Sequence, residues 1–446
     1  MLDTSFKAFI TKEALIGADD VVLLAVSGGL DSAVLAHLFA QSSHFFAIAH
    51  ANFGLRGAES DGDERWVAAL AERYQVPFYT HRFATKDYAH DHGLSTQVAA
   101  RRLRYAWLET VCADHDYARI ATAHHQDDQL ETTLLNLVRG TGVAGLRGML
   151  PRRGALVRPL LFAPREALET YAQQQNLTWR EDQSNAADAY RRNQVRHRVV
   201  PLLKQLNPNL LGTYERTRER LRATEQLLHA EVKRVKQQAQ QQTGQEVWLV
   251  KEVLRSHPQA ALILAELIRP YGFSYQQARD INRCIATDQS VGKQFDSLQH
   301  TLFVDRQHLI VIEKQENQTP SQFIQASDTQ VKLPSRLLTI ATKSAVGYLL
   351  PRQRHVAALD ADRIHFPLQL RLWRPGDRFC PLGMEHHKKL SDFLIDQKVP
   401  RHQKATVYVL TSAEDIVWVV GWRIDQRYRV TDQTQKVYEI ISTAAQ

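Results

Sequence analysis

The chain has 446 residues, a formal net charge of +8 at pH 7, 44% hydrophobic residues and 23% charged residues. This composition is close to that of ordinary globular proteins and excludes a chain that is disordered throughout. No apolar stretch approaches the roughly 18 residues of a membrane-spanning helix. The N-terminal residues lack the apolar block of a secretion signal. We therefore expect a cytoplasmic protein without membrane contact.

The three cysteines, Cys112, Cys284 and Cys380, lie far apart and form no Cys-x-x-Cys pair. This spacing disfavours a disulfide framework, a zinc site and a cysteine-bound cluster. Lys and Arg (56) exceed Asp and Glu (48). If this excess is unevenly distributed along the chain, it indicates a polyanionic partner.

Residues 20–160 alternate between short apolar segments and helical segments. The predicted strands are Val21–Val26, Phe45–His50, Phe78–Phe83 and Ala118–His124. The predicted helices are Ser32–Gln41, Asp63–Tyr74, Thr96–His115 and Gln129–Arg139. This alternation predicts an α/β fold with a doubly wound parallel sheet, helices on both faces and ligand chemistry at the carboxyl ends of the strands.

The rest of the chain divides into an arginine-rich link, a mainly helical middle part and a small strand-rich α/β module. The link covers Pro151–Pro208, and a long helix is predicted from Leu211 to about Gln242. A smaller helical segment, about 246–290, is followed by a few strands up to about Lys314. Gln315–Asp328 is polar and is predicted to be a linker. The predicted domains are residues 1–210, 211–318 and 330–446.

The strongest local motif is Ser27-Gly28-Gly29-Leu30-Asp31-Ser32, between the first predicted strand and a helix. Two glycines allow successive N–H groups to point into one concavity, and the helix N-terminus adds partial positive charge. This arrangement suits a pyrophosphate, although neither GxxxxGK[ST] nor GxGxxG is present. Asp31 would repel phosphate unless Mg²⁺ lies between them or the carboxylate caps the helix. A plain strand–helix turn with Ser and Asp caps is the alternative.

Two motifs offer contacts to the rest of a nucleotide. His50, Asn52 and Arg56 follow the second strand, where contacts to adenine and phosphate are expected; the alternative is an ordinary Asn/Gly loop. Arg101 and Arg104 are three residues apart and share one helical face. Two guanidiniums there would stabilise charge on an α-phosphate. The alternative is a solvated basic helix face.

Asp128 and Glu131 form an acidic pair at the start of the helix after the fourth strand. Paired carboxylates beside a phosphate site need a cation, which is either Mg²⁺ or a substrate ammonium group. His124 and His125 precede the pair, but adjacent side chains at a strand end usually point in opposite directions, which disfavours shared metal ligation. The alternative for the acids is charge that complements the helix dipole.

Two basic regions are candidates for RNA contact. Ala189–Tyr214 holds five Lys/Arg and no acid, and residues 371–404 hold eight Lys/Arg and four acids. Trp373, Phe379 and Phe393 lie among the latter, where they suit stacking on unpaired bases or, alternatively, form the module's own core. Solvated basic faces are the other alternative. The residues predicted to contact RNA are Arg192, Arg196, Arg198, Arg371, Arg374, Arg378, Lys388, Lys389 and Arg401.

The SGGLDS motif in its strand–loop–helix context resembles the PP-loop ATP pyrophosphatase superfamily. Further segments are similar to one branch, the tRNA(Ile)-lysidine synthetases: HANFGLRGAESDGDE, ARRLRY, TAHHQDDQLETTLLNLVRGTGVAGLRGM, DQSNAADAYRRNQVRHRVVPLL, RLWRPGDRFCPLGM, KKLSDFLIDQKVPR and VWVVGWRIDQRYRVT. The similarity covers both ends of the chain, whereas residues from about 215 to 330 carry no matching motif. Phe53 departs from the family, whose members commonly have a second histidine at this position.

The resemblance implies an enzyme that joins lysine to C2 of the wobble cytidine, position 34, of tRNA(Ile) with a CAU anticodon. ATP would adenylate the cytidine O2 and release pyrophosphate, and the lysine amine would then displace AMP. The lysidine formed would change codon reading from AUG to AUA and tRNA identity from methionine to isoleucine. A PP-loop tRNA thiolase and a non-catalytic ATP- and RNA-binding protein are the alternatives.

The resemblance also implies roles for single residues. Ser27–Ser32 would hold the pyrophosphate, with Asp31 acting through Mg²⁺. Asp128 and Glu131 would bind the ammonium groups of lysine, with Arg101 or Arg104 assisting at the adenylate. The resemblance further allows Arg192 or Arg196 to reach the active site. The oligomeric state is left open, with a homodimer as one option.

Overall fold

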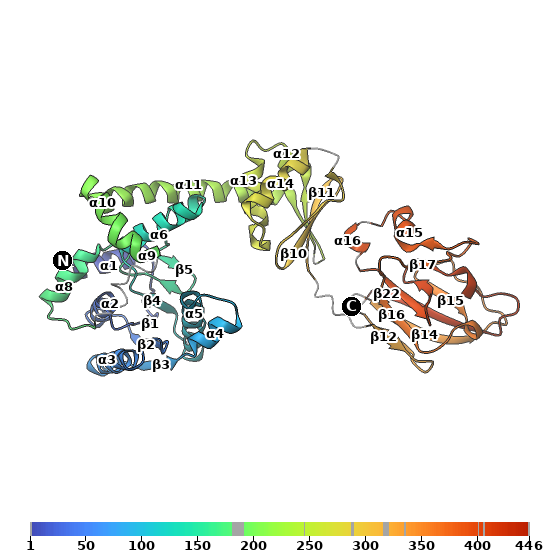
Figure 1. Ribbon diagram of the computed structural model, residues 1–446, viewed down its shortest axis with the longest axis horizontal. Helices are drawn as coiled ribbons and strands as arrows, with labels where there is room; N and C mark the ends of the chain where they lie inside the picture. Colours follow the sequence, from blue (N-terminus) through green and yellow to red (C-terminus); the bar gives the residue numbers. More distant parts are fainter. Residues whose placement is uncertain are drawn as a thin grey trace. The chain divides into compact units, whose positions relative to one another are not determined.

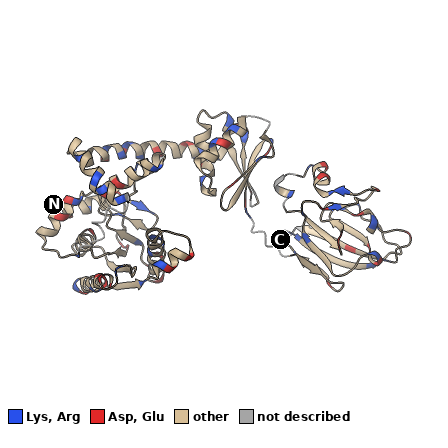
Figure 2. Cartoon of the chain, in the orientation of Figure 1, with Lys and Arg blue, Asp and Glu red and all other residues tan. Residues whose placement is uncertain are grey.

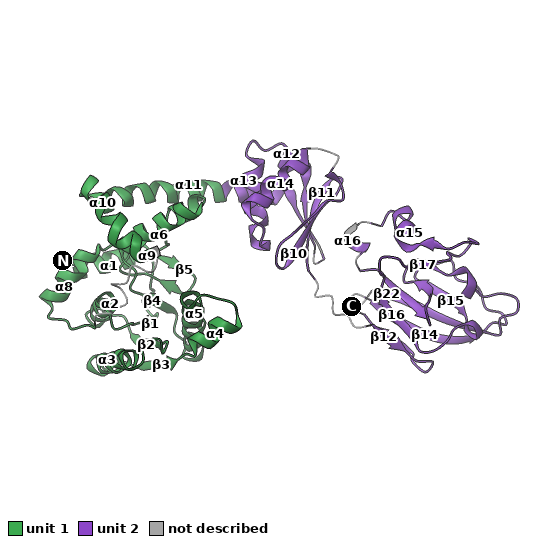
Figure 3. Cartoon of the chain, in the orientation of Figure 1, with its two compact units in different colours: residues 1–229 green, residues 230–446 purple. Residues whose placement is uncertain are grey.

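The computed structural model describes residues 2–180, 191–244, 246–286, 290–314, 321–333, 336–399, 401–404 and 406–444. The chain forms two compact units, residues 1–229 and 230–446, which are coloured separately in Figure 3. Among the described helices, none combines the length and the apolar character that crossing a membrane requires.

A six-stranded sheet with the order β3-β2-β1-β4-β6-β5 forms the centre of the first unit (Figure 1). All neighbouring pairs are parallel except β5–β6, which is antiparallel. The strands are β1 (Val22–Ala25), β2 (Phe46–Asn52), β3 (Phe78–Arg82), β4 (Arg119–Thr122), β5 (Arg152–Arg153) and β6 (Leu156–Val157). The four strands predicted from the sequence are therefore confirmed, whereas the short β5 and β6 were not predicted.

Helices cover both faces of this sheet, as a doubly wound fold requires. Side chains alternate along β1: Leu24 belongs to a core cluster with residues of α1, α2, α3 and α8, whereas Leu23 packs on the other face with residues of α5. Most residues of the largely apolar α2 are buried. The helices are α1 (Leu2–Lys12), α2 (Leu30–Ala40), α3 (Ala58–Tyr74), α4 (Thr85–Asp91), α5 (Thr96–Asp114) and α8 (Arg165–Gln174).

A second group of helices lies after the carboxyl ends of the strands. These are α6 (Gln126–Arg139), α7 (Val143–Leu146), α9 (Arg191–Gln194), α10 (Val200–Leu206) and α11 (Leu210–Ala239). A π-helical turn, Val195–Val199, joins α9 to α10, and both α9 and this turn contact α6. The basic region Ala189–Tyr214 is thus helical from Arg191 to Leu206, whereas residues 181–190 lie outside the described part of the chain.

The long helix α11 begins within the first unit. The Tyr214 hydroxyl lies 2.5 Å from Thr133 Oγ1 and donates to the Gln129 carbonyl at 3.3 Å. Arg218 is only 3% exposed and donates from Nε to the Arg147 carbonyl at 3.0 Å. These contacts fix the first turns of α11 to the segments that follow β4.

The predicted long helix is confirmed, but it ends at Ala239, before the last glutamines. Gln240–Thr243 forms β7, which pairs antiparallel with β8 (Glu246–Val250). Gly244 has a φ of +60° and allows the tight turn between them. Pairing with β8 therefore overrides the helical tendency of glutamine.

The second unit begins with the five-stranded antiparallel sheet β7-β8-β11-β10-β9 and three helices. Its further elements are α12 (Lys251–Arg255), α13 (Ala260–Ile268), α14 (Tyr275–Ala286), β9 (Gln294–Asp296), β10 (His300–Val304) and β11 (His308–Glu313). The helical segment and the strands before Lys314 agree with the sequence prediction.

The C-terminal module contains two sheets, ordered β12-β16-β19-β20-β21 and β13-β14-β22-β15, and a β17–β18 pair. Its strands are β12 (Gln322–Ile324), β13 (Gln330–Lys332), β14 (Arg336–Ser344), β15 (Val356–Asp360), β16 (Leu368–Leu372), β17 (Arg378–Phe379), β18 (Lys388–Lys389), β19 (Tyr408–Ser412), β20 (Asp415–Val419), β21 (Arg423–Ile424) and β22 (Lys436–Ala444). Its helices are α15 (Leu390–Asp396) and α16 (Arg401–Lys404).

The predicted linker Gln315–Asp328 is wrong in its second half. β12 lies inside it and pairs antiparallel with β16, and Ile324 is fully buried in the module's core. A single apolar pair, Phe323-Ile324, within a polar stretch gives too short a pattern to predict a strand. Residues 315–320 lie outside the described residues.

Candidate active site at the carboxyl ends of the strands

The loop between β1 and α2 is closed by its own serines. Ser32 Oγ donates to the Gly29 carbonyl at 2.8 Å and accepts from Ser27 N at 3.2 Å. Gly28 has a φ of +95°, which favours glycine. Among the described residues, no side chain caps α2, so its first amides remain available to an anion. Leu30 is buried in the core and offers only its main chain to the loop.

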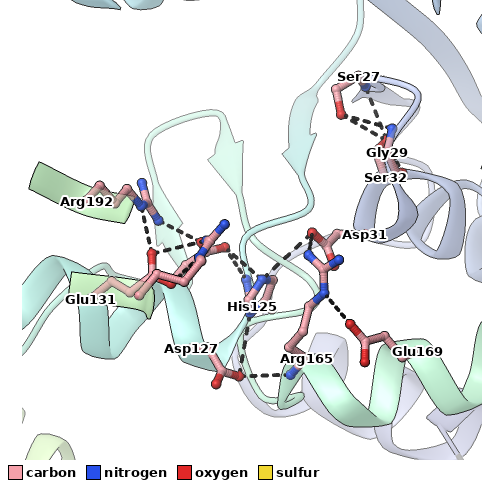
Figure 4. Close-up of polar contacts among 12 residues, drawn as sticks. Ser27, Gly29, Asp31, Ser32, His125, Asp127, Glu131, Arg165, Glu169 and Arg192 are labelled. Atoms are coloured by element: carbon pink, nitrogen blue, oxygen red, sulfur yellow. Dashed lines mark hydrogen bonds and ion pairs between the residues drawn. The ribbon is translucent and has the colours of Figure 1, made fainter. Parts of the chain in front are cut away.

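Asp31 points from α2 toward a group of charged residues (Figure 4). Its Oδ2 accepts from Arg165 Nη1 at 2.8 Å and lies 3.8 Å from His125 Nε2. Burial raises the pKa of Asp31, although His125 and Arg165 act in the opposite direction. Asp31 Oδ1 is buried and has no hydrogen-bond partner among the described residues. An unpartnered carboxylate oxygen beside a phosphate loop fits Mg²⁺, which commonly takes one or two protein carboxylates and completes its shell with phosphates and water.

The three residues predicted after β2 are tied to other protein groups. His50 is buried, with Nδ1 2.9 Å from the Val26 carbonyl. Asn52 Nδ2 donates to Glu64 Oε2 at 2.7 Å, and Asn52 Oδ1 accepts from Gly54 N at 3.0 Å. Arg56 donates from Nη2 to an Asp63 oxygen at 2.7 Å. Through these contacts the three residues shape the two loops beside the site.

The acidic pair is buried, and two arginines neutralise it. Glu131 accepts from Arg192 Nε at 2.8 Å (Figure 4). It also accepts from Arg196 Nε at 2.6 Å. Asp128 Oδ1 accepts from Arg192 Nη2 at 2.6 Å and from Arg196 Nη2 at 3.2 Å. The sequence assigned the acids to lysine and the arginines to tRNA, with a return to the active site as an option. The structure brings all four side chains together.

The charges around Asp128 keep it ionised. Burial by itself raises its pKa, but His125 and Arg192 outweigh burial and lower the pKa to about 2. The His125 main-chain N–H also donates to Asp128 Oδ2 at 3.1 Å. Asp128 is therefore a carboxylate at every pH at which the protein would work.

The two histidines before α6 have different surroundings. His124 Nδ1 lies 2.9 Å from Thr122 Oγ1, and burial lowers the pKa of His124 to about 3. His125 is 2% exposed and faces both Asp31 and Asp128, with Nε2 3.4 Å from Asp128 Oδ2. Within the described ranges, no group of three or more His, Cys, Asp or Glu side chains is arranged to hold a metal ion. A Mg²⁺ on Asp31 would therefore depend on phosphate oxygens for most of its ligands.

A basic cluster of Arg101, Arg104 and Arg158 lies next to this site, and Arg104 and Arg158 are close enough to lower the pKa of His124. The guanidiniums of Arg101 and Arg104 lie 5.0 Å and 5.1 Å from the centre of the Tyr105 ring. Arg104 Nε and Arg158 Nε are buried and have no hydrogen-bond partner within the described part of the chain. Burial lowers the pKa of both arginines. Arg158 also donates from Nη1 to the Leu150 carbonyl at 2.6 Å. Because burying a cation is costly when its N–H groups are not all satisfied, this cluster suits an anion.

Three family models match the chain along most of its length. They are a PP-loop domain over residues 2–203, a TilS substrate binding domain over residues 241–314 and a TilS substrate C-terminal domain over residues 368–441. The PP-loop match contains the whole of the Ser27–Ser32 loop and the acidic pair.

Curated relatives match over nearly the full length. A tRNA(Ile)-lysidine synthase from Parabacteroides distasonis is 36% identical over 439 residues, which cover 97% of this chain and 98% of the relative. The tRNA(Ile)-lysidine synthase of Bacteroides thetaiotaomicron is 35% identical over 97% of this chain and 98% of its own. This chain belongs to the tRNA(Ile)-lysidine synthase family.

A U34-tRNA thiolase from Methanococcus maripaludis is a more distant structural neighbour. Its TM-score is 0.40, with 19% identity over 49% of this chain and 78% of the thiolase. This likeness is too weak to bear on the reaction of a tRNA(Ile)-lysidine synthase family member.

Sequence reasoning missed several charged residues of this synthase-family site. Arg165 donates from Nη1 to Asp31 and from its main chain to Asp127 Oδ2 at 2.9 Å. Lys204 donates to the other Asp127 oxygen at 2.8 Å. Arg158 is 5% exposed. The sequence did hold a signal for two of these residues: Arg158 lies inside the apolar stretch Val157–Ala163, and Arg165 lies just after it.

The C-terminal residues predicted to contact tRNA differ in their surroundings. Arg371 forms two hydrogen bonds of 2.9 Å with the Asp377 carboxylate, so it stabilises the turn that follows β16. Lys388 pairs with Asp396. Arg374, Arg378, Lys389 and, in the first unit, Arg198 are exposed. The side chain of Arg401 lies outside the described residues.

The aromatic residues of this module form its core, which corrects the expectation that they stack on bases. Phe379 is fully buried and Phe393 is 5% exposed, and their rings pack edge to face at 5.0 Å. Trp373 packs partly against the same cluster and donates from Nε1 to the Lys404 carbonyl. Sequence spacing alone does not distinguish an aromatic core from a stacking platform.

Proposed function

We propose that this protein ligates lysine to C2 of the wobble cytidine, position 34, of tRNA(Ile) with a CAU anticodon, forming lysidine, AMP and pyrophosphate. Full-length similarity to tRNA(Ile)-lysidine synthases supports this reaction. The observation that carries the proposal is the buried pair Asp128 and Glu131 beside a phosphate loop. The His125 side chain is close both to Asp31, which follows the phosphate loop, and to Asp128 of the acidic pair.

In the first half-reaction, the cytidine O2 attacks the α-phosphorus of ATP and pyrophosphate leaves. The Ser27–Ser32 loop binds the β- and γ-phosphates through the first amides of α2. Mg²⁺ held by Asp31 Oδ1 would neutralise charge on the phosphate oxygens. Arg104, which lies over the Tyr105 ring, and the buried Arg158 supply positive charge for the α-phosphate. Arg101 lies on the same ring and assists from the exposed side.

In the second half-reaction, the lysine side-chain amine attacks C2, and the C2–O2 bond breaks as AMP leaves. The carboxylates of Asp128 and Glu131 bind the ammonium group of the lysine backbone or side chain. Both carboxylates are held by Arg192 and Arg196 in the structure. Lysine therefore binds by sharing these oxygens with the guanidiniums or by replacing them, and arginines that are replaced become available to phosphate.

The exposed cations Arg374, Arg378 and Lys389 of the C-terminal module, together with Arg198, are proposed to contact tRNA phosphates. Figure 2 shows Lys and Arg on α9, α11 and the C-terminal module. An anticodon loop suits this reaction because its unpaired wobble base reaches an active site at a low unstacking cost. The second unit would hold the tRNA body while the first unit carries the chemistry.

The thiolase alternative is disfavoured by the cysteines. All three are buried, and burial raises the pKa of Cys112 to about 11, so its thiol stays protonated and unreactive. Sulfur transfer needs an accessible thiolate or a cluster held by cysteines.

The test is pyrophosphate release from ATP in the presence of unmodified CAU-anticodon tRNA(Ile), with and without radiolabelled lysine. The proposal expects label on the tRNA and one AMP for each lysine transferred. Pyrophosphate without lysine transfer would retain the adenylation and reject lysine as the nucleophile. ATP binding without pyrophosphate would favour the non-catalytic alternative.

A further inference from the structure

The Ser27–Ser32 loop accepts a hydrogen bond from a residue that lies far away in the sequence. The main-chain N–H of Arg180 donates to the Gly28 carbonyl at 3.0 Å. Because a peptide unit is planar, fixing this carbonyl also fixes the direction of the Gly29 N–H on the same peptide. Gly29 is the N-cap of α2, and its N–H makes one long hydrogen bond, to Ser27 Oγ at 3.4 Å. In the proposed ATP complex, this N–H joins the first amides of α2 in binding a phosphate.

The side chain of Arg180 is anchored on α3. Its Nε donates to Asp63 Oδ1 at 2.5 Å, while Arg56 donates to the other oxygen of the same carboxylate at 2.7 Å. The Asp63 side chain is 10% exposed, against 40% for Arg180 and 31% for Arg56. The largely buried Asp63 carboxylate therefore binds two guanidiniums, those of Arg56 and Arg180, which lie far apart in the sequence.

A glycine inside α3 makes room for this anchor. A Cβ on Gly62 would lie 3.0 Å from Arg180 Nη2 and 3.2 Å from its Cζ. Glycine within a helix costs about 1 kcal/mol relative to alanine, so its presence there needs a reason. The close approach of the guanidinium supplies it. The β-carbon of Asp63, on the next residue, would in turn lie 3.9 Å from a Cβ on Gly28.

We propose that Arg180 and Asp63 are positioning residues for ATP in the reaction proposed above, on which this inference rests. Asp63 holds the Arg180 guanidinium, the guanidinium holds the main chain at residue 180, and that amide holds the Gly28–Gly29 peptide in its phosphate-binding orientation. Neither residue touches the reacting atoms. Their loss therefore acts on ATP binding and leaves lysine binding unchanged.

The experiment measures steady-state kinetics and ATP affinity for the full-length Arg180→Gln and Asp63→Asn variants. The KM for ATP, and the dissociation constant of ATP measured calorimetrically without tRNA, should rise about tenfold, the usual effect of losing one hydrogen bond to a charged group. The KM for lysine should stay within about twofold of the wild-type value. Arg180→Lys, which keeps a charged donor, should recover most of the affinity.

The matched control is Arg82→Gln. Arg82 pairs with Asp61 on the same helix at 2.8 Å but at a more exposed position. This variant should keep the wild-type KM for ATP. The double variant R180Q/D63N should lose no more affinity than one single variant, because the two residues act as one unit.

Unchanged ATP affinity in R180Q would overturn the inference, and so would equal losses for ATP and lysine, which indicate general damage to the fold. The calorimetric arm needs neither tRNA nor lysine. A wild-type protein that binds ATP but transfers no lysine would therefore reject the proposed function, while the positioning roles would still be decided by ATP affinity.

Discussion

Arg196 lies against Glu131, with Nε 2.6 Å from Oε1 and Nη2 3.1 Å from Oε2. Glu131 is 2% exposed, and Arg192 reaches the same carboxylate from the preceding helical turn. A lysine ammonium group that binds here competes with guanidiniums that are already in place. In the proposed reaction, the affinity for lysine therefore depends on how tightly Arg192 and Arg196 hold Asp128 and Glu131.

Glu131→Gln should raise the KM for lysine by about tenfold or more, because the amide keeps the shape of the side chain but loses its charge. The KM for ATP should change little. The measurement is lysine-dependent labelling of tRNA at saturating ATP. Glu166→Gln, at an exposed position of α8, is the control and should match the wild type. An unchanged KM for lysine in E131Q would remove Glu131 from the lysine site.

Gly28→Ala should abolish most ATP binding at a modest cost in stability. The φ of +95° disfavours any residue with a Cβ, and this atom would face Trp66, Val67 and Asp63 at 3.8–3.9 Å. Gly93→Ala is the matched comparison, because Gly93 also has a positive φ of +60° but no neighbouring atom within 4 Å of the added Cβ. Both variants should lose about 1 kcal/mol of stability. Only G28A should lose ATP in a calorimetric titration.

His124 should make the first unit less stable in acid. Burial, together with Arg158 and Arg104, lowers its pKa to about 3, although Asp128 acts in the opposite direction. A group with a depressed pKa in the folded state contributes its stability above the unfolded value of about 6.5, and this contribution is lost as the pH falls toward 3. Lowering the pH from 7.5 to 5.5 should cost about 1 kcal/mol through this residue.

The check is thermal unfolding of wild type and His124→Asn at both pH values. The variant should lose less stability on acidification than the wild type. His90→Asn is the control, since the His90 side chain is 90% exposed, and it should behave as the wild type. Equal losses in wild type and H124N would show that His124 is not the group that takes up the proton.

Arg378→Gln should weaken tRNA binding mainly at low salt. Each lost phosphate contact lowers the magnitude of the log–log salt slope by about 0.9 on a duplex stem. Arg371→Gln should leave this slope unchanged and instead lower the melting temperature, because Arg371 is held by Asp377. Filter binding across a salt series separates these outcomes. An unchanged slope for R378Q would place Arg378 outside the tRNA footprint.

The sequence was sufficient for features that depend on local patterns. β1 to β4 are short apolar segments bounded by loops and were predicted correctly. The Ser27–Ser32 motif is continuous in the chain, and its predicted place between a strand and a helix is confirmed. The acidic pair was found because Asp128 and Glu131 are three residues apart on one helix. In each case the residues that define the feature are neighbours in the sequence.

Contacts between distant segments were not predictable in the same way. Arg165 reaches Asp31 across 134 positions, and Arg180 reaches Asp63 across 117. No periodicity records such a pair, because each arginine alone resembles a solvated surface residue. The strands β7 and β12 were missed for a related reason, since each is fixed by its partner strand and not by its own composition.

The contacts of α11 bear on where this protein can be divided. The matched PP-loop region ends at residue 203. Beyond it, Tyr214 donates a hydrogen bond to the Gln129 carbonyl, within α6, and Arg218 donates one to the Arg147 carbonyl, after α6. A fragment cut at 203 would leave these carbonyls, within and after α6, without their partners. A fragment extended to residue 229, where the compact unit ends, would retain them. The helix that leaves the catalytic fold is thus also part of its scaffold, and an exchange of tRNA-binding modules between relatives would have to be joined beyond it.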